Sequence, residues 1–191
     1  MRVSKEVMAK NNGKIIESAA YLFRTKGIDG TSVSDVMEAA GLTHGGFYRH
    51  FDSKEELLNE SINKAFNHIT TNLRENIDNL GAKKAIVNYV DKYLSMGHVE
   101  TPGIGCPMAA LGSEAKQNSS QFKENLTKGK KEVVNLIMEG LSGSSREKKN
   151  KALALISLLV GTIILARSTE DLTERQDLLK LVKVKSRDYI S

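Results

Sequence analysis

Residues 31–54 read TSVSDVMEAAGLTHGGFYRHFDSK and contain two short helix signals on either side of a glycine. Ser32 and Asp35 have the spacing of a capping box, which predicts the start of a helix. That helix should stop at Gly41, because glycine readily adopts the left-handed conformation that ends helices. Thr43 is then placed to cap a second short helix. Two short helices joined by a tight turn are typical of a helix-turn-helix unit.

A longer helix is expected on each side of this unit. Before it, one apolar face at helical spacing is formed by Ile16, Ala19, Ala20 and Phe23. Asn11 or Asn12 is placed to cap that helix, and Gly27 to end it. After the unit, Ser53 and Glu56 have capping-box spacing and predict a long helix that runs to about residue 80.

The second short helix carries groups suited to a phosphate backbone. Its start is formed by Thr43, His44, Gly45 and Gly46. Free amide N–H groups at a helix start favour phosphate, and absent side chains let the backbone approach closely. Donors along the same edge are supplied by Tyr48, His50 and Lys54. We expect Phe47 and Phe51 in the core of the head, and simple packing is the alternative role for Tyr48.

The same stretch resembles the TetR/AcrR family of repressors. The family signature reads approximately Thr-x-Val-x-Asp-Ile-Ala-x-x-Ala-Gly-Val-Ser-x-Gly-x-Phe-Tyr-x-His-Phe-x-Ser-Lys-Glu-x-Leu, and the match extends over about residues 12–60. Met37 stands for the usual alanine and Leu42 for valine, which keeps both positions apolar. The resemblance implies a DNA-reading head, a helical bundle that binds a ligand and dimerises, and a homodimer on a pseudo-palindromic DNA operator.

The resemblance also implies roles for individual residues. Thr43 and His44 would contact base edges or phosphates at the start of the recognition helix. Tyr48, His50 and Lys54 would hold the DNA backbone, and two serines of the preceding helix would contact phosphate. The expected DNA-contacting residues are Ser32, Ser34, Thr43, His44, Gly45, Gly46, Tyr48, His50 and Lys54.

The rest of the chain is expected to be helical as well. Apolar spacing predicts further helices over residues 82–96, 107–115, 119–141, 144–165 and 168–190. Their starts are expected at Pro107, at Ser119 or Ser120, at Ser144 with Glu147, and at Ser168 with Asp171. About nine helices and no convincing strand predict an all-α fold. We expect a DNA-binding domain over residues 1–54 and a ligand-binding and dimerisation domain over residues 55–191.

The segment 152–166 is apolar nearly all round. It is shorter than the roughly 20 residues that a membrane span needs, so we expect no membrane contact. A helix without a polar face must be covered on several sides. We therefore expect a homodimer through the last two helices, residues 146–168 and 171–190, with Gly161 and Ala166 permitting close approach. Burial within one subunit is the alternative.

A ligand pocket is expected in the second domain, because the resemblance implies release from DNA by a small-molecule inducer. Side chains that combine apolar area with adaptable shape are candidates for its lining. They are Phe66, Tyr89, Tyr93, Met96, Cys106, Met108 and Phe122. Residues of these types at helical spacing are also typical of an ordinary core, which is the alternative.

Cys106 is the single cysteine of the chain and precedes Pro107, which suits the first position of a helix. Free N–H groups at a helix start can lower a thiol pKa, so a thiol-reactive inducer is one hypothesis. The Gly-Cys entry and the run Leu-Ala-Arg-Ser at 165–168 are similar to a subgroup of the family in which some members respond to electrophiles or oxidants and others bind drugs or aromatic compounds. A buried structural cysteine is the alternative. A cysteine enzyme that pairs Cys106 with His98 is the enzymatic alternative.

The composition narrows the class of protein. The 191 residues carry a net charge of +5, which favours a polyanionic partner such as double-stranded DNA. A single cysteine and a first segment without the layout of a secretory signal predict a cytoplasmic protein. The histidines show no ligand spacing with Cys106, so we expect no metal, no other cofactor and no enzymatic activity. A ligand-responsive repressor is expected, and a DNA-binding regulator without a ligand, or an activator, is the alternative.

Overall fold

The computed structural model describes residues 5–190; the outer ends of the two expected domains, residues 1–4 and 191, lie outside that range. Within residues 5–190 the chain forms nine α-helices, three 3-10 helices and no strand, which confirms the all-α fold. The α-helices are α1 (Lys5–Lys26), α2 (Val33–Ala39), α3 (Lys54–Leu80), α4 (Ala82–Tyr93), α5 (Met96–Glu100), α6 (Pro107–Leu111), α7 (Ser120–Glu139), α8 (Ser145–Ser168) and α9 (Leu172–Ile190). The 3-10 helices are η1 (His44–Arg49), η2 (Pro102–Ile104) and η3 (Gly112–Gln117).

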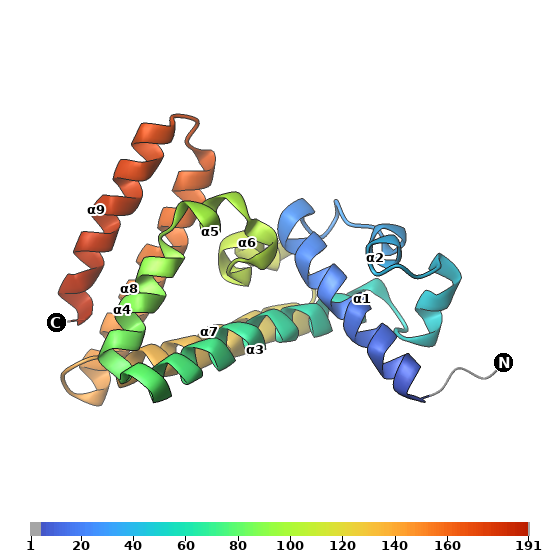
Figure 1. The fold of residues 1–191 in the computed structure, drawn as a ribbon, viewed down its shortest axis with the longest axis horizontal. Coiled ribbons are helices and arrows are strands. Elements are labelled where there is room, and N and C mark those ends of the chain that lie inside the picture. Colours follow the sequence, from blue (N-terminus) through green and yellow to red (C-terminus); the bar gives the residue numbers. More distant parts are fainter. Residues whose placement is uncertain (1–4, 191) are drawn as a thin grey trace.

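The elements α1, α2 and η1 form a head at one end of the molecule, on the right in Figure 1. Its core is aromatic and apolar, with Phe23, Met37, Phe47 and Phe51 all buried. Gly27 and Gly41 have positive φ angles of 80° and 70° just beyond α1 and α2. Both glycines therefore end their helices as expected.

The capping box of α2 forms in full. The Ser32 hydroxyl accepts a hydrogen bond from the Asp35 amide at 3.1 Å, and the Asp35 carboxylate accepts one from the Ser32 amide at 2.8 Å. At the start of α3, the Ser53 hydroxyl accepts from the Glu56 amide at 3.0 Å. The Glu56 carboxylate, however, accepts from the amide of Asp52 at 2.6 Å, so only half of the expected box is present.

Two other expected caps in the head are wrong. Asn11 and Asn12 lie inside α1, which already includes Lys5. Thr43 occupies the cap position of η1, but its side chain makes no capping hydrogen bond. The second short helix is also 3-10 rather than α, with the Gly46 amide donating to the Thr43 carbonyl at 3.0 Å. A six-residue segment with two glycines has little helix propensity, and short pieces of this kind commonly take 3-10 geometry.

Two helices of the body end earlier than expected. α4 stops at Tyr93 instead of near residue 96, and α6 stops at Leu111 instead of near residue 115. The short elements α5 and η2 follow α4, and η3 follows α6. The chain between α4 and α6 is therefore a series of single turns rather than an open loop.

The remaining caps follow the expected pattern except at the last helix. Ser119 caps α7, and Ser144 forms a full capping box at α8. At α9 the Asp171 carboxylate accepts from the Glu174 amide at 2.7 Å. Ser168 is instead the last residue of α8, so its expected role as a cap of α9 is wrong.

The long helix α3 is shared by the head and the body. It packs on α1 at one end and on α4 and α7 along the rest of its length, and it lies beside α7 along the lower edge of Figure 1. Gly129 of α7 lies directly against the Phe66 ring of α3, which allows the two helices to approach closely. The expected domain boundary at residue 54 thus falls at the first residue of a continuous helix, and no linker separates the two parts.

The helices α8 and α9 stand side by side at the end of the molecule away from the head (Figure 1). One side of α8 is buried in the body, through Ala152, Leu155, Ile156, Leu159, Thr162, Ile163 and Ala166. Large apolar side chains on the two helices nevertheless stay exposed, namely Leu153, Ile164, Leu165, Leu172, Leu181 and Val184. By length and composition α8 could also cross a membrane, a test that core helices of soluble proteins pass as well.

Candidate DNA-contacting head and ligand cavity

The 3-10 helix η1 presents most of the residues expected to contact DNA. Tyr48 is 70% exposed, and its ring meets the buried Phe47 ring edge-on at 5.2 Å between centroids. The packed ring therefore holds an outward-pointing hydroxyl. Exposed neighbours are Thr43, His44 and Gly45, while Gly46 and His50 are half-buried. The Gly46 amide is already used within η1, so it is not free for a phosphate.

The two serines of α2 have their hydroxyls engaged within the head. Ser32 donates to the Asp35 carboxylate at 2.7 Å as part of the capping box. Ser34 lies 3.0 Å from Nδ1 of His44, which joins α2 to η1 across the turn. These side chains thus shape the surface that is expected to face DNA.

Lys54, at the start of α3, contacts the head through its ammonium group. Its ammonium donates to the Ile28 carbonyl at 2.6 Å and lies 6.0 Å from the centre of the Phe23 ring. An ammonium has three N–H donors, so two remain for other partners. Lys54 therefore has a structural role that the sequence did not indicate.

Arg49 is a further candidate that was not among the residues expected to contact DNA. It lies on η1 between Tyr48 and His50, and its side chain is exposed. The signal was present, because a cation flanked by two expected phosphate donors is itself suited to a phosphate contact.

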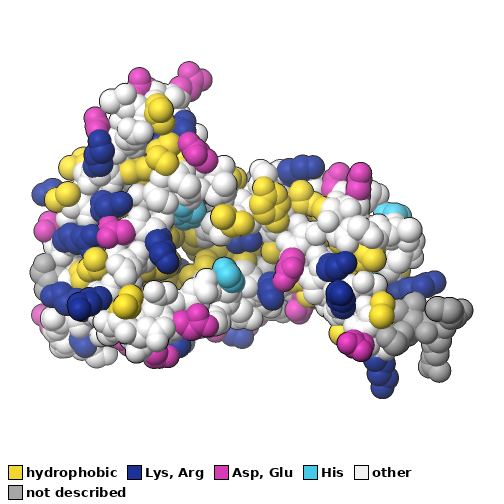
Figure 2. Space-filling view, viewed as in Figure 1, with side chains coloured by type: hydrophobic (Ala, Val, Ile, Leu, Met, Phe, Trp, Pro, Cys, Tyr) yellow, Lys and Arg dark blue, Asp and Glu magenta, His cyan; other side chains and the backbone are white. Residues whose placement is uncertain are grey.

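A cavity of about 610 Å³ opens between α3, α4 and residues 95–106. It appears as the hollow in the middle of the body in Figure 2. Its volume is typical of small-molecule sites. Tyr89, Tyr93 and Cys106 line it, so the structure brings together three of the seven expected pocket residues.

The other four expected residues lie outside the cavity lining. Phe66 and Phe122 are buried in the main core, and Met96 and Met108 are half-buried against it. The sequence also missed the polar part of the lining, which includes His68, Asn72, Asn76, Asn88, Lys92, Ser95, His98 and Thr101. Polar side chains on a cavity wall carry the same pattern as polar side chains on an ordinary surface, so no sequence signal separated the two.

His98 holds the floor of the cavity, which is formed by residues 101–106. Its Nδ1 lies 2.8 Å from the Tyr93 carbonyl, and its Nε2 accepts from the Cys106 amide at 3.0 Å. This arrangement requires a neutral imidazole with its proton on Nδ1. Burial lowers the pKa of His98, and the charges of Arg167 and Arg24 lower it further. Because His98 contacts the amide of Cys106, the pair lacks the base-to-thiol contact that a cysteine enzyme uses.

Two tyrosines form the aromatic side of the cavity. The Tyr93 ring meets the His98 ring edge-on at 4.4 Å, and the Tyr89 and Tyr93 rings lie 5.7 Å apart. Burial raises the pKa of both hydroxyls well above the ordinary value, and the Cys106 thiol adds to the rise. Both hydroxyls therefore stay protonated at neutral pH.

The floor of the cavity is hydrogen-bonded to the head. The Arg24 guanidinium of α1 donates to the Gly105 carbonyl at 2.7 Å and to the Ala20 carbonyl at 2.7 Å. Burial lowers the pKa of Arg24 to about 10. The Ile28 amide donates to the Glu114 carboxylate at 3.1 Å, which adds a second link between head and body.

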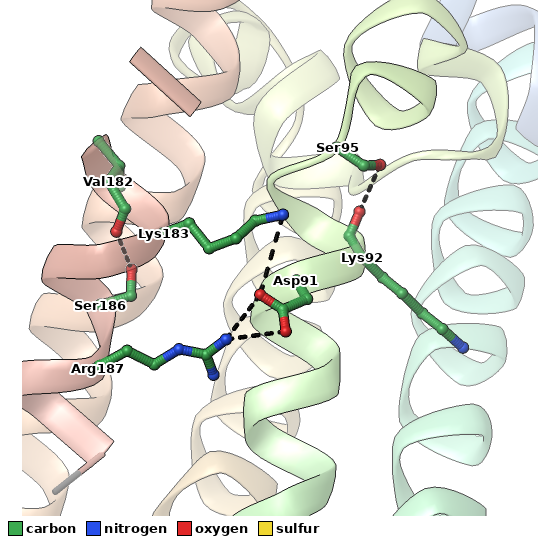
Figure 3. A network of polar contacts seen from close by, with 7 residues as sticks. All are labelled: Asp91, Lys92, Ser95, Val182, Lys183, Ser186 and Arg187. Carbon is green, nitrogen blue, oxygen red and sulfur yellow. Dashed lines mark hydrogen bonds and ion pairs between the residues drawn. The ribbon is translucent and has the colours of Figure 1, made fainter. Parts of the chain in front are cut away.

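The same helix α4 that lines the cavity is also held by α9. Figure 3 shows Asp91 of α4 contacted by Arg187 at 2.8 Å and by Lys183 at 3.9 Å. The neighbouring Lys92 extends the opposite way, toward α3. Successive residues of α4 thus face the last helix and the cavity.

Comparisons with known proteins match this layout. A family model described as "Bacterial regulatory proteins, tetR family" matches residues 15–61, from α1 into α3. The biofilm operon icaADBC negative transcriptional regulator IcaR of Staphylococcus epidermidis is 31% identical over 81 residues, which cover 42% of this chain and 44% of that relative. The head of the chain thus belongs to the TetR family of bacterial regulatory proteins. The aligned part spans less than half of the length of IcaR.

Solved structures share the whole fold of this chain. A TetR regulator from Chloroflexus aurantiacus is 25% identical, with a TM-score of 0.77 and coverage of 97% of this chain and 96% of its own. Reduced NemR of Escherichia coli superposes with a TM-score of 0.80 at 19% identity, covering 95% of this chain and 97% of its own, which is a likeness of fold. All cavity-lining residues lie outside the matched segment 15–61. The family match therefore concerns the head, and the cavity must be interpreted from its own chemistry.

Proposed function

We propose that the chain is a homodimeric TetR-type transcriptional repressor that a small molecule releases from its DNA operator. The observation that carries this proposal is the surface of η1, where the exposed Tyr48, His44 and Arg49 side chains stand together on a short helix packed against α2. Such a helix fits a major groove, with its polar side chains reaching base edges and phosphates. The net charge of +5 favours the same partner.

Dimerisation is proposed through α8 and α9. Their exposed apolar side chains, such as Leu165 and Leu181, need cover that the single chain does not provide. A twofold mate with the same face would cover them, and the dimer would carry two heads for the two halves of a pseudo-palindromic site.

The DNA-binding part is tested with fragments selected from the native genome. Affinity for the best fragment is measured over a range of salt concentrations for the wild type, Tyr48→Phe and Arg49→Gln. Loss of the Tyr48 hydroxyl should weaken binding about 3- to 10-fold without changing thermal stability. Loss of Arg49 should make the slope of the logarithm of the binding constant against the logarithm of the salt concentration shallower by about one. Tyr21→Phe and Arg146→Gln are matched controls outside the proposed DNA surface; unchanged binding in both test variants would overturn the assignment of this surface.

Ligand-dependent release is proposed to act through the floor of the cavity. Residues 101–106 border the cavity and contact α1, through the Arg24 hydrogen bond to Gly105 and the close packing of Gly103 on Tyr21. A ligand that prefers a floor position incompatible with DNA binding would shift the dimer away from its operator, since only differential affinity for two states is needed. Screening small molecules for release of the selected fragment tests this step.

A more specific version of this proposal is that the inducer reacts with the Cys106 thiol. Cys106 borders the cavity and is 5% exposed, so a reagent would have to enter the cavity to reach it. If quinones or aldehydes release wild-type protein and Cys106→Ser equally, the thiol is not the sensor. If no compound releases the protein, a regulator without a ligand becomes the better interpretation, and a reporter gene beside the operator separates repression from activation.

A further inference from the structure

Tyr93 carries a buried hydroxyl whose hydrogen-bonding capacity is hardly used. The side chain is 5% exposed and lines the cavity, and its hydroxyl has no nitrogen or oxygen partner among residues 5–190. The Cys106 thiol interacts with it as a hydrogen-bond partner, but a thiol is a weak donor and a weak acceptor. A buried hydroxyl without a good partner is unfavourable, because it has given up its hydrogen bonds with water. A ligand that supplies a hydrogen-bond partner for this hydroxyl would therefore bind with higher affinity than a similar ligand that does not.

The proton of the Tyr93 hydroxyl calls for an acceptor. The Tyr93 hydroxyl keeps its proton at neutral pH, so it is available as a donor. The neighbouring His98 ring cannot accept this proton, because Nδ1 faces the Tyr93 carbonyl and Nε2 already accepts from the Cys106 amide. A ligand oxygen is the group that fits.

The charges around the cavity disfavour a cationic ligand. No Asp or Glu lines the cavity within the described chain, and Lys92 is its one lining Lys or Arg. Two arginines lie behind the floor. Arg167 donates hydrogen bonds to the backbone carbonyls of His98, Val99 and Ala109. Arg24 donates hydrogen bonds to the backbone carbonyls of Ala20 and Gly105. Neither guanidinium forms an ion pair within residues 5–190. The side chains at and behind the cavity therefore favour an anionic or neutral ligand over a cationic one.

The other walls are suited to a flat apolar body. Tyr89 and Tyr93 present two aromatic rings, and Ile69, Leu73 and Ile104 add aliphatic surface. We propose that the cavity binds a small aromatic molecule that carries a carbonyl or carboxylate oxygen and no cationic group, with that oxygen accepting the hydrogen bond of Tyr93. Lys92 adds affinity for the anionic members of this class. This inference deepens the proposed inducer site and rests on the proposed function.

Four naphthalene probes test the proposal by isothermal titration against the full chain. They are 2-acetylnaphthalene, 2-naphthoate, 2-naphthylmethylammonium and naphthalene itself. We expect the two oxygen-bearing probes to bind at least about 10-fold more tightly than the ammonium probe. Tyr93→Phe should weaken both oxygen-bearing probes about 5-fold and leave naphthalene unchanged. Removing an unpaired hydroxyl should not lower thermal stability, so the variant is expected to fold.

Lys92→Gln provides an independent test, because its exposed side chain is not needed for folding. It should weaken 2-naphthoate but leave 2-acetylnaphthalene unchanged, whereas Lys123→Gln on α7 should change neither. Equal binding of the ammonium probe, or no effect of Tyr93→Phe on the oxygen-bearing probes, would overturn the proposal. Absence of binding by all four probes in protein that still binds its operator would overturn it too, and would leave the DNA-binding function intact. Failure of the wild type to bind any genomic fragment would instead count against the proposed function.

Discussion

Arg24 of α1 donates a hydrogen bond to the carbonyl of Gly105 at 2.7 Å, which connects the head directly to the wall of the cavity. Gly105 has no room for a side chain, since an added Cβ would lie 2.5 Å from the His98 ring. Gly105 is therefore held between Arg24 of α1 on one side and the His98 ring on the other. A ligand that displaces the floor must strain or break the contact with Arg24.

Replacing Arg24 by methionine should uncouple the two parts. The variant keeps the apolar stem but loses two hydrogen bonds to backbone carbonyls, so we expect the free energy of unfolding to fall by about 1–3 kcal/mol. Release from DNA by an inducer should need a higher inducer concentration than in the wild type. Chemical denaturation and fluorescence anisotropy of labelled operator measure the two effects. Arg146→Met, in an exposed turn of α8, is the matched control, and equal behaviour of the two variants would contradict the coupling role.

Sequence reasoning was accurate where structure is decided locally. The capping box of Ser32 and Asp35, the helix ends at Gly27 and Gly41 and the buried Phe47 all follow from residues close to one another in the chain. The head could therefore be predicted almost residue by residue. Its main errors, the 3-10 geometry of η1 and the missing Thr43 cap, arise where two glycines weaken the local preference.

The cavity could not be predicted in the same way. Tyr93, His98 and Cys106 meet because α4 stops early and the following single turns fold back, which depends on contacts with α1 and α8. Phe66 and Phe122 are residues of a type expected to line a pocket, but their side chains are buried in the core. Only tertiary packing decides which aromatic side chains meet an open space.

The contact between Gly129 and Phe66 makes a prediction about stability. Alanine has a higher helix propensity than glycine by up to about 1 kcal/mol, so Gly→Ala inside an open helix should stabilise the protein. At Gly129 an added Cβ would overlap the Phe66 ring, whereas at Gly13 of α1 nothing lies within 4 Å. Gly129→Ala should therefore lower the free energy of unfolding by about 1–3 kcal/mol, and Gly13→Ala should raise it slightly. Thermal unfolding of both variants measures the difference, and a stabilised Gly129→Ala would show that α3 and α7 are not so closely packed.

The exposed apolar face of α8 and α9 makes a prediction about assembly. Leu165 and Leu181 are 56% and 58% exposed in the single chain. A charge placed in a covered interface must be desolvated, so Leu165→Asp with Leu181→Asp should produce a monomer at micromolar concentration. Sedimentation measures the state, and operator affinity should fall with it. Leu80→Asp changes a leucine that is 44% exposed at the end of α3, and it should leave the dimer intact. A monomeric wild type would remove the proposed interface.

The neutral state of His98 makes stability depend on pH. Burial lowers its pKa in the folded protein, so the unfolded chain binds a proton more readily than the folded one. The stabilisation is therefore fully present above the unfolded pKa of about 6.5 and is lost as the pH falls through the lower folded value. Protonation would also place an N–H of His98 against the Cys106 amide, in place of the present 3.0 Å hydrogen bond. Arg167 and Arg24 oppose the added charge, while the Tyr93 carbonyl favours it.

We expect the thermal unfolding midpoint of the wild type to decrease as the pH is lowered from about 7.5 to about 5.5. This range lies above the ordinary pKa values of the carboxylates. His98→Gln keeps a donor and an acceptor but cannot be protonated, so its midpoint should change less over the same range. His68→Gln is the control, because His68 is exposed on α3 and its contact with Asn72 lies at the surface. Differential scanning fluorimetry across this range separates the three proteins. A pH dependence that survives in His98→Gln and disappears in His68→Gln would assign the titration to the wrong histidine and remove the argument that a neutral His98 holds the cavity floor.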